Sequence, residues 1–236
     1  MKYYKFVSDH TSVPYFLDGS IKFTPISELN DPSELTSNII KEDVEQSLNR
    51  LRKNGYRESD LQYLKQQGHL LQRLAPEFQA ARVPQTVVQA TTLIRSRFYD
   101  NLPLLEQLLA ETATQISSKV GLFCVSKRFD SLPMWAHYAT SASGLVVVFE
   151  GLDDVFQGDD TGVLKKPIDV RYNREESGVT FEPSSHEALF FEKFQDWSYE
   201  QEVRVVMPLD ECKVVRVKEN NLYLYKIPPT HISELI

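Results

Sequence analysis

Short apolar runs mark both ends of the chain, whereas the middle has apolar residues at helical spacing. In the first zone, residues 1–35, the pattern predicts a strand over 3–7, a helix over 11–17 and a strand over 21–23. The third zone, residues 119–236, is rich in β-branched and aromatic residues separated by turn residues. It predicts strands at 121–125, 144–149, 168–172, 202–207, 212–217 and 221–226.

The middle zone, residues 36–118, is polar and rich in Gln, Leu, Glu and Arg. Its leucines recur at helical spacing between Gly and Pro residues, which predicts about four helices. A further helix is predicted at 185–196, where Ser184 and Glu187 have capping-box spacing and the phenylalanines form an apolar stripe. We therefore expect an α+β fold with a split, mostly antiparallel β core and a helical insertion at 36–118. Strand 202–207 should lie centrally in that core.

Composition limits the classes of protein to consider. The length of 236 residues suits one domain, or one domain with a sizeable insertion, and 42% hydrophobic with 25% charged residues is typical of an ordinary globular protein. The net charge of −7 gives no global basic field for nucleic acid or a membrane surface. Cys124 and Cys212 lie in apolar runs and read as buried thiols. Without a signal peptide or a long apolar run, we expect a cytoplasmic protein with no membrane association.

Residues 121–150 predict a strand, a turn, a short helix and a second strand, with polar aromatic residues on the helix. Asp130 or Ser131 can cap that helix, and Pro133 suits its first turn. Ser131, Trp135 and Tyr138 are spaced to share one helix face, where two aromatic rings offer a platform for a flat ligand ring. The alternative is that both rings plug the helix onto the sheet.

Residues 197–204, WSYEQEVR, carry the second chemical signal. If the segment is one strand, Glu200, Glu202 and Arg204 share a face at about 7 Å per two-residue step. One carboxylate can then hold a sugar hydroxyl while a cationic transition state develops, and the other can deprotonate an acceptor. The alternative is a solvated face of an edge strand, with Arg204 pairing with Glu202.

Two weaker signals are an acidic helix start and a basic loop. In residues 30–34, NDPSE, Asp31 reads as a helix N-cap, although Asn30 and Glu34 suit a pocket wall as well. Lys127 and Arg128, like Arg204, suit contact with a pyrophosphate; a surface loop is the alternative for the first two.

These motifs together resemble a known family. The N-terminal Tyr-Lys strand, N-D-P-x-E, the block CxS…SxPMWxHYA…G and the late WxYExExR are similar to the bacterial domain-of-unknown-function family 2971. More distantly, the order of elements resembles the ADP-ribosyltransferase fold, in which NAD sits in a cleft between two small sheets.

The second resemblance implies residue roles. It places Tyr4, Lys5 and Ser126 near the dinucleotide, with Lys5 near the position that holds the cofactor ribose. It places Ser131, Trp135 or Tyr138 against the nicotinamide. Glu202 would be the catalytic glutamate on the ribose 2′-hydroxyl, and Glu200 the base on the acceptor side. Glu202→Gln should then slow NAD cleavage by on the order of 10²–10³, with a stability change within about 1 kcal/mol on a half-exposed strand.

The resulting functional hypothesis is an NAD-using ADP-ribosyltransferase or NAD glycohydrolase, with a toxin or anti-phage effector as the analogous context. NAD would be the substrate, and the acceptor a protein or nucleic acid. One alternative is a metal-dependent phosphodiesterase or nuclease with Asp31, Glu200 and Glu202 as Mg²⁺ ligands. Another is a non-enzymatic module that binds a ligand or docks a partner through the helical insertion.

Overall fold

The computed structural model describes residues 1–29, 117–159, 164–173, 190–217 and 219–236, together with Asn49, Lys53 and Thr114. Nearly all of the predicted helical insertion lies outside these residues, as do the whole NDPSE segment and most of the start of the helix predicted at 185–196. Within the described residues, no helix is long and apolar enough to cross a membrane.

The N-terminal elements follow the predicted order of strand, helix and strand. They are β1 (Lys2–Val7), η1 (His10–Ser12), α1 (Val13–Leu17), β2 (Ser20–Pro25) and η2 (Ile26–Glu28). Asp9 begins the helical part, because its carboxylate accepts a hydrogen bond from the Thr11 backbone N–H at 2.9 Å. Pro14 then lies in the first turn of α1, where the missing N–H has no intrahelical partner to lose.

The C-terminal zone is strand-rich, as predicted. Its elements are β3 (Val120–Ser126), α6 (Leu132–Tyr138), β4 (Leu145–Glu150), α7 (Leu152–Val155), β5 (Ile168–Asp169), β6 (Arg171–Asn173), β7 (Glu192–Phe194), η5 (Gln195–Glu200), β8 (Glu202–Pro208), η6 (Leu209–Glu211), β9 (Lys213–Val217), β10 (Asn220–Lys226), η7 (Pro229–His231) and β11 (Ile232–Leu235).

Three elements differ from the sequence-based prediction. The helix predicted at 185–196 is wrong over its last residues, which form β7 and the start of η5. The strand predicted at 168–172 is two strands, β5 and β6, which the sequence pattern joined across Val170. The last strand, β11, was not predicted, because its residues ISEL offer little apolar alternation.

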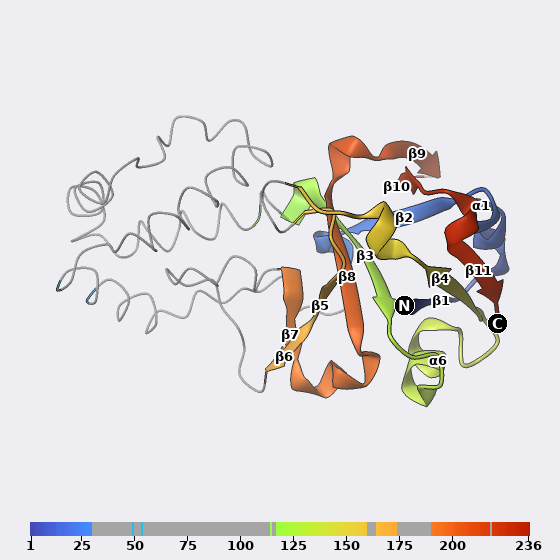
Figure 1. Ribbon diagram of the computed structural model, residues 1–236, viewed down its shortest axis with the longest axis horizontal. Coiled ribbons are helices and arrows are strands. Elements are labelled where there is room, and N and C mark those ends of the chain that lie inside the picture. Colours follow the sequence, from blue (N-terminus) through green and yellow to red (C-terminus); the bar gives the residue numbers. More distant parts are fainter. Residues whose placement is uncertain are drawn as a thin grey trace.

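The strands form a curled antiparallel sheet, so the α+β class and the mostly antiparallel core are confirmed (Figure 1). The order is β11-β4-β1-β3-β2-β10-β9, and β8 pairs with the other edge of β3 and with β5. Among the described strands, the parallel pairing is that of β6 with β7, which form a separate two-stranded sheet.

The sheet is split where β1 and β2 leave β3. Strand β1 pairs with the end of β3 through Tyr4 and Ser126, whereas β2 pairs with its start through Thr24 and Leu122. Both pairings use the edge of β3 that faces away from β8. Along this edge, β1 and β2 therefore move apart between Leu122 and Ser126. The Lys5 ammonium group lies in this split and donates a hydrogen bond to the Cys124 carbonyl oxygen at 2.9 Å.

Strand β8 lies centrally, as predicted, because all seven of its residues are buried. Val203 and Val205 pack into one hydrophobic cluster with Phe123, and Val206 packs into a second on the other face. At the start of β3, an added Cβ on Gly121 would lie 2.6 Å from a Leu209 side-chain atom and 2.9 Å from Phe23 Cβ. A glycine is therefore required where β2 and the segment after β8 approach β3.

Candidate functional site

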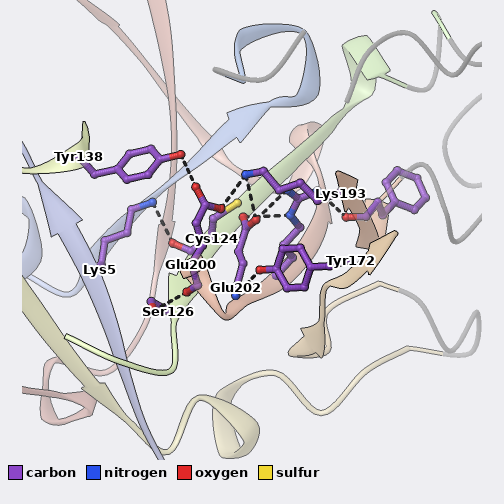
Figure 2. Close-up of polar contacts among 10 residues, drawn as sticks. Lys5, Cys124, Ser126, Tyr138, Tyr172, Lys193, Glu200 and Glu202 are labelled. Atoms are coloured by element: carbon purple, nitrogen blue, oxygen red, sulfur yellow. Dashed lines mark hydrogen bonds and ion pairs between the residues drawn. The ribbon is translucent and has the colours of Figure 1, made fainter. Parts of the chain in front are cut away.

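A cavity of about 430 Å³ lies in the split of the sheet. Its walls come from β1 and β2, which diverge there, from β3, and from α6, β7 and the η5–β8 junction. The predicted site residues that line it are Tyr4, Lys5, Ser126, Tyr138, Glu200, Glu202 and Arg204. Segments that lie far apart in the sequence therefore meet at one site, and Figure 2 shows the polar contacts at its centre.

The short helix α6 sends its two large aromatic residues to different places. Trp135 packs edge-on against Phe6 of β1, with ring centroids 5.4 Å apart, and its indole N–H donates to the Phe129 carbonyl at 2.6 Å. Trp135 thus plugs the helix onto the sheet and does not line the cavity, so its predicted place in the cleft is wrong. Ser131 is also outside the cavity wall; it occupies the N-cap position without a capping hydrogen bond from its side chain. Tyr138, the last residue of α6, does line the cavity.

Glu200 and Glu202 meet through a turn rather than along a strand. Glu200 ends η5 and Glu202 begins β8, and Gln201 between them is left-handed, with φ of 43° and ψ of 51°. The expected period-two alternation is therefore wrong at this point. Both glutamates are buried, at 2% and 7% exposure, which also contradicts the alternative of a solvated edge strand.

A lysine that the sequence did not single out joins these carboxylates. The Lys193 ammonium lies 2.7 Å from Glu200 Oε2 and 3.4 Å from Glu202 Oε2. Its side chain is 5% exposed, and the Trp197 ring centroid lies 4.8 Å from Nζ. The sequence offers one signal, a single lysine among the aromatic residues of 190–197, but the spacing of those aromatic residues predicts an amphipathic helix and gives the lysine no role.

Glu202 is held by several groups at once. Arg204 donates from Nε to Oε1 at 3.0 Å and from a terminal nitrogen to Oε2 at 2.8 Å. A second terminal nitrogen of Arg204 donates to the Phe190 carbonyl at 2.9 Å. The Glu202 backbone N–H donates to the Tyr172 hydroxyl oxygen at 2.8 Å. Arg204 pairs with Glu202, as one alternative expected, but the pair is buried.

The three cations proposed for a pyrophosphate are all paired with carboxylates. Arg204 is paired with Glu202, and the other two lie nearer the surface. Lys127 and Asp169 are 2.6 Å apart, and Arg128 and Asp130 are 2.8 Å apart. Each therefore has a protein partner with which a phosphate would have to compete.

The two glutamates differ in acidity because their surroundings differ. Burial raises the pKa of Glu200, and the nearby charge of Glu202 adds to this effect, against the opposing influence of Lys193 and Tyr138. Burial also acts to raise the pKa of Glu202, but the charges of Arg204 and Lys193 outweigh it and hold that pKa below its ordinary value. Glu202 therefore stays ionised at neutral pH, whereas Glu200 accepts a proton more readily.

The phenol of Tyr138 donates a hydrogen bond to Glu200 Oε1 at 2.6 Å (Figure 2). Burial raises the pKa of Tyr138, and the bond to Glu200 raises it further, so the phenol stays protonated. Burial likewise raises the pKa of the Cys124 thiol, which hydrogen-bonds with Glu202. The site thus joins an ionised carboxylate, a carboxylate of raised pKa, a neutral phenol and a neutral thiol.

The geometry does not favour the metal-ion alternative. Within the described part of the chain, no three His, Cys, Asp or Glu side chains group as metal ligands, and Asp31 lies outside that part. The oxygens of Glu200 and Glu202 already accept hydrogen bonds from Lys193 and Arg204. The burial of Glu202 also corrects the expected tolerance to Glu202→Gln, because a buried charged group is much less replaceable than a half-exposed one.

Comparison with known proteins gives one match to a family model, and it covers part of the chain. Residues 134–205 match the family model described as Protein of unknown function (DUF2971). The match covers less than a third of the chain and spans Tyr138, Lys193, Glu200 and Glu202. No curated protein and no solved structure matches the chain. The resemblance to domain-of-unknown-function family 2971 is thus supported over 134–205, and the resemblance to ADP-ribosyltransferases stays a prediction.

Proposed function

We propose that the protein binds NAD in the cavity of the split sheet and cleaves the bond between nicotinamide and ribose, as an ADP-ribosyltransferase or an NAD glycohydrolase. One observation carries the proposal: Lys5, Tyr138, Glu200 and Glu202, singled out from separate motifs, line the same cavity. A single pocket that combines an aromatic residue, a cation and two carboxylates of different acidity suits a charged, ring-bearing substrate.

Size and charge of the cavity support a ligand with an anionic group. Its volume of about 430 Å³ falls within the roughly 300–1,000 Å³ of small-molecule sites. Lys5 contacts the Cys124 carbonyl, and no carboxylate of the described residues pairs with its ammonium group. An ammonium group without a carboxylate partner attracts a phosphate, which makes Lys5 a better candidate for this contact than Lys127 or Arg128. Tyr4 also lines the cavity, and its ring packs against Phe129 with centroids 5.3 Å apart.

The proposed step breaks the C–N bond between ribose and nicotinamide. The bonding electron pair leaves with the nicotinamide nitrogen, which becomes neutral, and the ribose carbon becomes an oxocarbenium-like cation. Glu202, kept ionised by Arg204, stabilises that positive charge. Water or an acceptor group then forms the new bond to the ribose carbon. The proton that the nucleophile loses passes to the Glu200 carboxylate and from there to solvent.

Nicotinamide release from NAD tests the proposal. Purified protein is incubated with NAD alone and with added protein or nucleic acid, and free nicotinamide and ADP-ribose conjugates are measured. We expect release by wild type and a loss on the order of 10²–10⁴ in Glu200→Gln, because the base for the nucleophile is removed. Glu150→Gln is the matched control, since that half-exposed glutamate pairs with Lys2 where β1 begins and β4 ends.

Three outcomes would count against the proposal or change it. Wild type that releases no nicotinamide under any of these conditions contradicts the catalytic part. Equal rates in wild type and Glu200→Gln remove Glu200 from the mechanism. Binding of NAD without cleavage would favour the alternative of a non-enzymatic ligand-binding module.

A further inference from the structure

Lys193 and Tyr172 face each other on the two-stranded sheet of β6 and β7. They are paired residues in its parallel register. From β7, the Lys193 ammonium reaches the carboxylates of both Glu200 and Glu202. From β6, the Tyr172 hydroxyl accepts the backbone N–H of Glu202. One pair of opposed residues therefore contacts both the side chains and the backbone of the η5–β8 junction (Figure 2).

The Lys193 ammonium is confined on several sides. The Trp197 ring covers it at 4.8 Å, and its side chain is almost fully buried. Such an ammonium keeps its charge in an apolar setting because two carboxylates balance it. The flexible stem of an exposed lysine permits many positions of its ammonium group. Here the enclosure holds the Lys193 ammonium in one position.

We propose that Lys193 is the positioning residue of this site: it holds the carboxylates of Glu200 and Glu202 in one orientation toward the cavity and offsets their mutual repulsion. This inference deepens the proposed function and rests on it for the catalytic readout. Two carboxylates at one site disfavour ionisation of both, and a cation between them reverses that effect. Lys193 acts through the glutamates, so it needs no contact with the reacting atoms.

The charged and titratable groups around Glu200 define what a change at Lys193 does. The groups that interact with this carboxylate are Tyr138 of α6, Tyr172 of β6, Lys193 of β7, Tyr199 of η5 and Glu202 of β8. Among them Lys193 is the cation. Lys193→Met should therefore raise the pKa of Glu200 by about one to three pH units, the size of the effect of a close opposite charge. The acid limb of the pH–rate profile should move upward by a similar amount.

The test compares Lys193→Met, Lys193→Arg and the control Lys2→Met, which removes a lysine from an exposed ion pair with Glu150. Nicotinamide release is followed against pH, and the titration of Glu200 is followed by NMR of labelled side-chain carboxyl carbons. In Lys193→Met we expect the acid limb of the rate profile and the Glu200 titration to shift upward, with most activity recovered at higher pH. The shifts should be smaller in Lys193→Arg and absent in Lys2→Met. A merely structural lysine would instead lower the rate by one factor at every pH.

The NMR titration keeps the inference independent of the proposed function. If wild type releases no nicotinamide, an unchanged Glu200 titration in Lys193→Met still overturns the inference, and a shifted one still supports it. If Lys193→Met does not fold, Lys193→Arg and Tyr172→Phe serve instead. Tyr172→Phe removes the hydroxyl that receives the Glu202 N–H but leaves the ammonium in place, so we expect the Glu200 titration to move less than in Lys193→Arg. A Tyr172→Phe shift as large as that of Lys193→Arg would contradict the assignment to the ammonium.

Discussion

The end of η5 and the start of β8 each present one glutamate, and the two carboxylates have opposite tendencies. Glu200, at the end of an irregular turn, accepts hydrogen bonds from Tyr138 and Lys193, and burial raises its pKa. Glu202, at the start of a regular strand, accepts hydrogen bonds from Nε and one terminal nitrogen of Arg204, and its pKa is depressed. The pKa values of these two glutamates thus shift in opposite directions because Glu202 has a fixed guanidinium partner, that of Arg204.

This difference separates a structural charge from an adaptable one. Arg204 and Glu202 satisfy each other with bidentate geometry in the protein interior, so either one alone leaves an uncompensated buried charge. Glu200 instead accepts hydrogen bonds from the ammonium of Lys193 and the phenol of Tyr138, and its protonation leaves no buried guanidinium unpaired. We therefore expect the fold to depend on Glu202 and proton transfer to depend on Glu200.

The largest expected effect is the loss of stability in Glu202→Gln. The free energy of unfolding should fall by about 3–5 kcal/mol, the range for breaking a buried ion pair, because Arg204 loses its counter-charge. Chemical denaturation followed by circular dichroism measures it. In the double variant Glu202→Gln/Arg204→Met the loss should be smaller than the sum of the two single losses. Additive losses would show that the pair is not coupled.

A smaller effect is expected for Tyr138→Phe. The change removes the hydroxyl that donates to Glu200 Oε1 and keeps the ring, so the free energy of unfolding should fall by about 1–2 kcal/mol. The pKa of Glu200 should rise, since that hydrogen bond favours the ionised form. Carboxyl-carbon NMR measures the titration of Glu200, which should shift, and of Glu202, which should shift less. An equal shift at Glu202 would argue against separate environments.

The pH dependence of stability should carry opposite signs for the two glutamates. The folded-state pKa of Glu200 is raised above the ordinary value of 4.5, so the folded protein binds a proton before the unfolded chain as pH falls from neutral. Stability from this residue therefore rises toward pH 4.5 and is lost as pH rises through the folded-state pKa. Glu202 acts inversely, and its contribution is lost below pH 4.5.

Denaturation of wild type and Glu200→Gln at several pH values between 7 and 4.5 tests this sign. The stability difference, wild type minus variant, should increase as the pH falls through that window. A difference that stays constant would show that the pKa of Glu200 is not raised in the folded protein.

The smallest effect is expected for Lys127→Met. Lys127 and Asp169 form an ion pair whose side chains are 34% and 66% exposed, so solvent screens it and its loss should change stability by less than about 1 kcal/mol. Thermal unfolding of Lys127→Met beside Lys193→Met contrasts an exposed with a buried lysine. Similar losses in the two variants would mean that burial does not govern these ion pairs.

Local patterns predicted most of the strands, because apolar runs such as LVVVF at 145–149 have few alternatives to a buried strand. The segment 190–197 was misassigned because the residue buried in β7 is Lys193, whereas Phe194 is 37% exposed. A hydrophobic pattern predicts the opposite, a buried phenylalanine and an exposed lysine. Lys193 is buried because the carboxylates of Glu200 and Glu202, which lie outside this segment, balance its charge.

Two further features depend on tertiary context. Gln201 adopts a left-handed conformation, for which the sequence gives no signal, since Gly, Asn or Asp are the residues that favour it. Trp135 and Tyr138 lie three positions apart on one helix, and their spacing alone predicts the same role for both rings. The split between β1 and β2 decides that Tyr138 borders the cavity, while Trp135 packs on Phe6.

The cavity borders β3 from Leu122 onward, so Gly121 lies just outside its wall. At Gly121, Phe23 of β2 and the Leu209 side chain approach the start of β3 closely. A methyl group there would have to push β2 outward or displace Leu209. Because β2 forms one wall of the cavity, we expect a side chain at position 121 to change the shape of the cavity without lining it. A screen for altered ligand size selectivity therefore has a natural starting position outside the site.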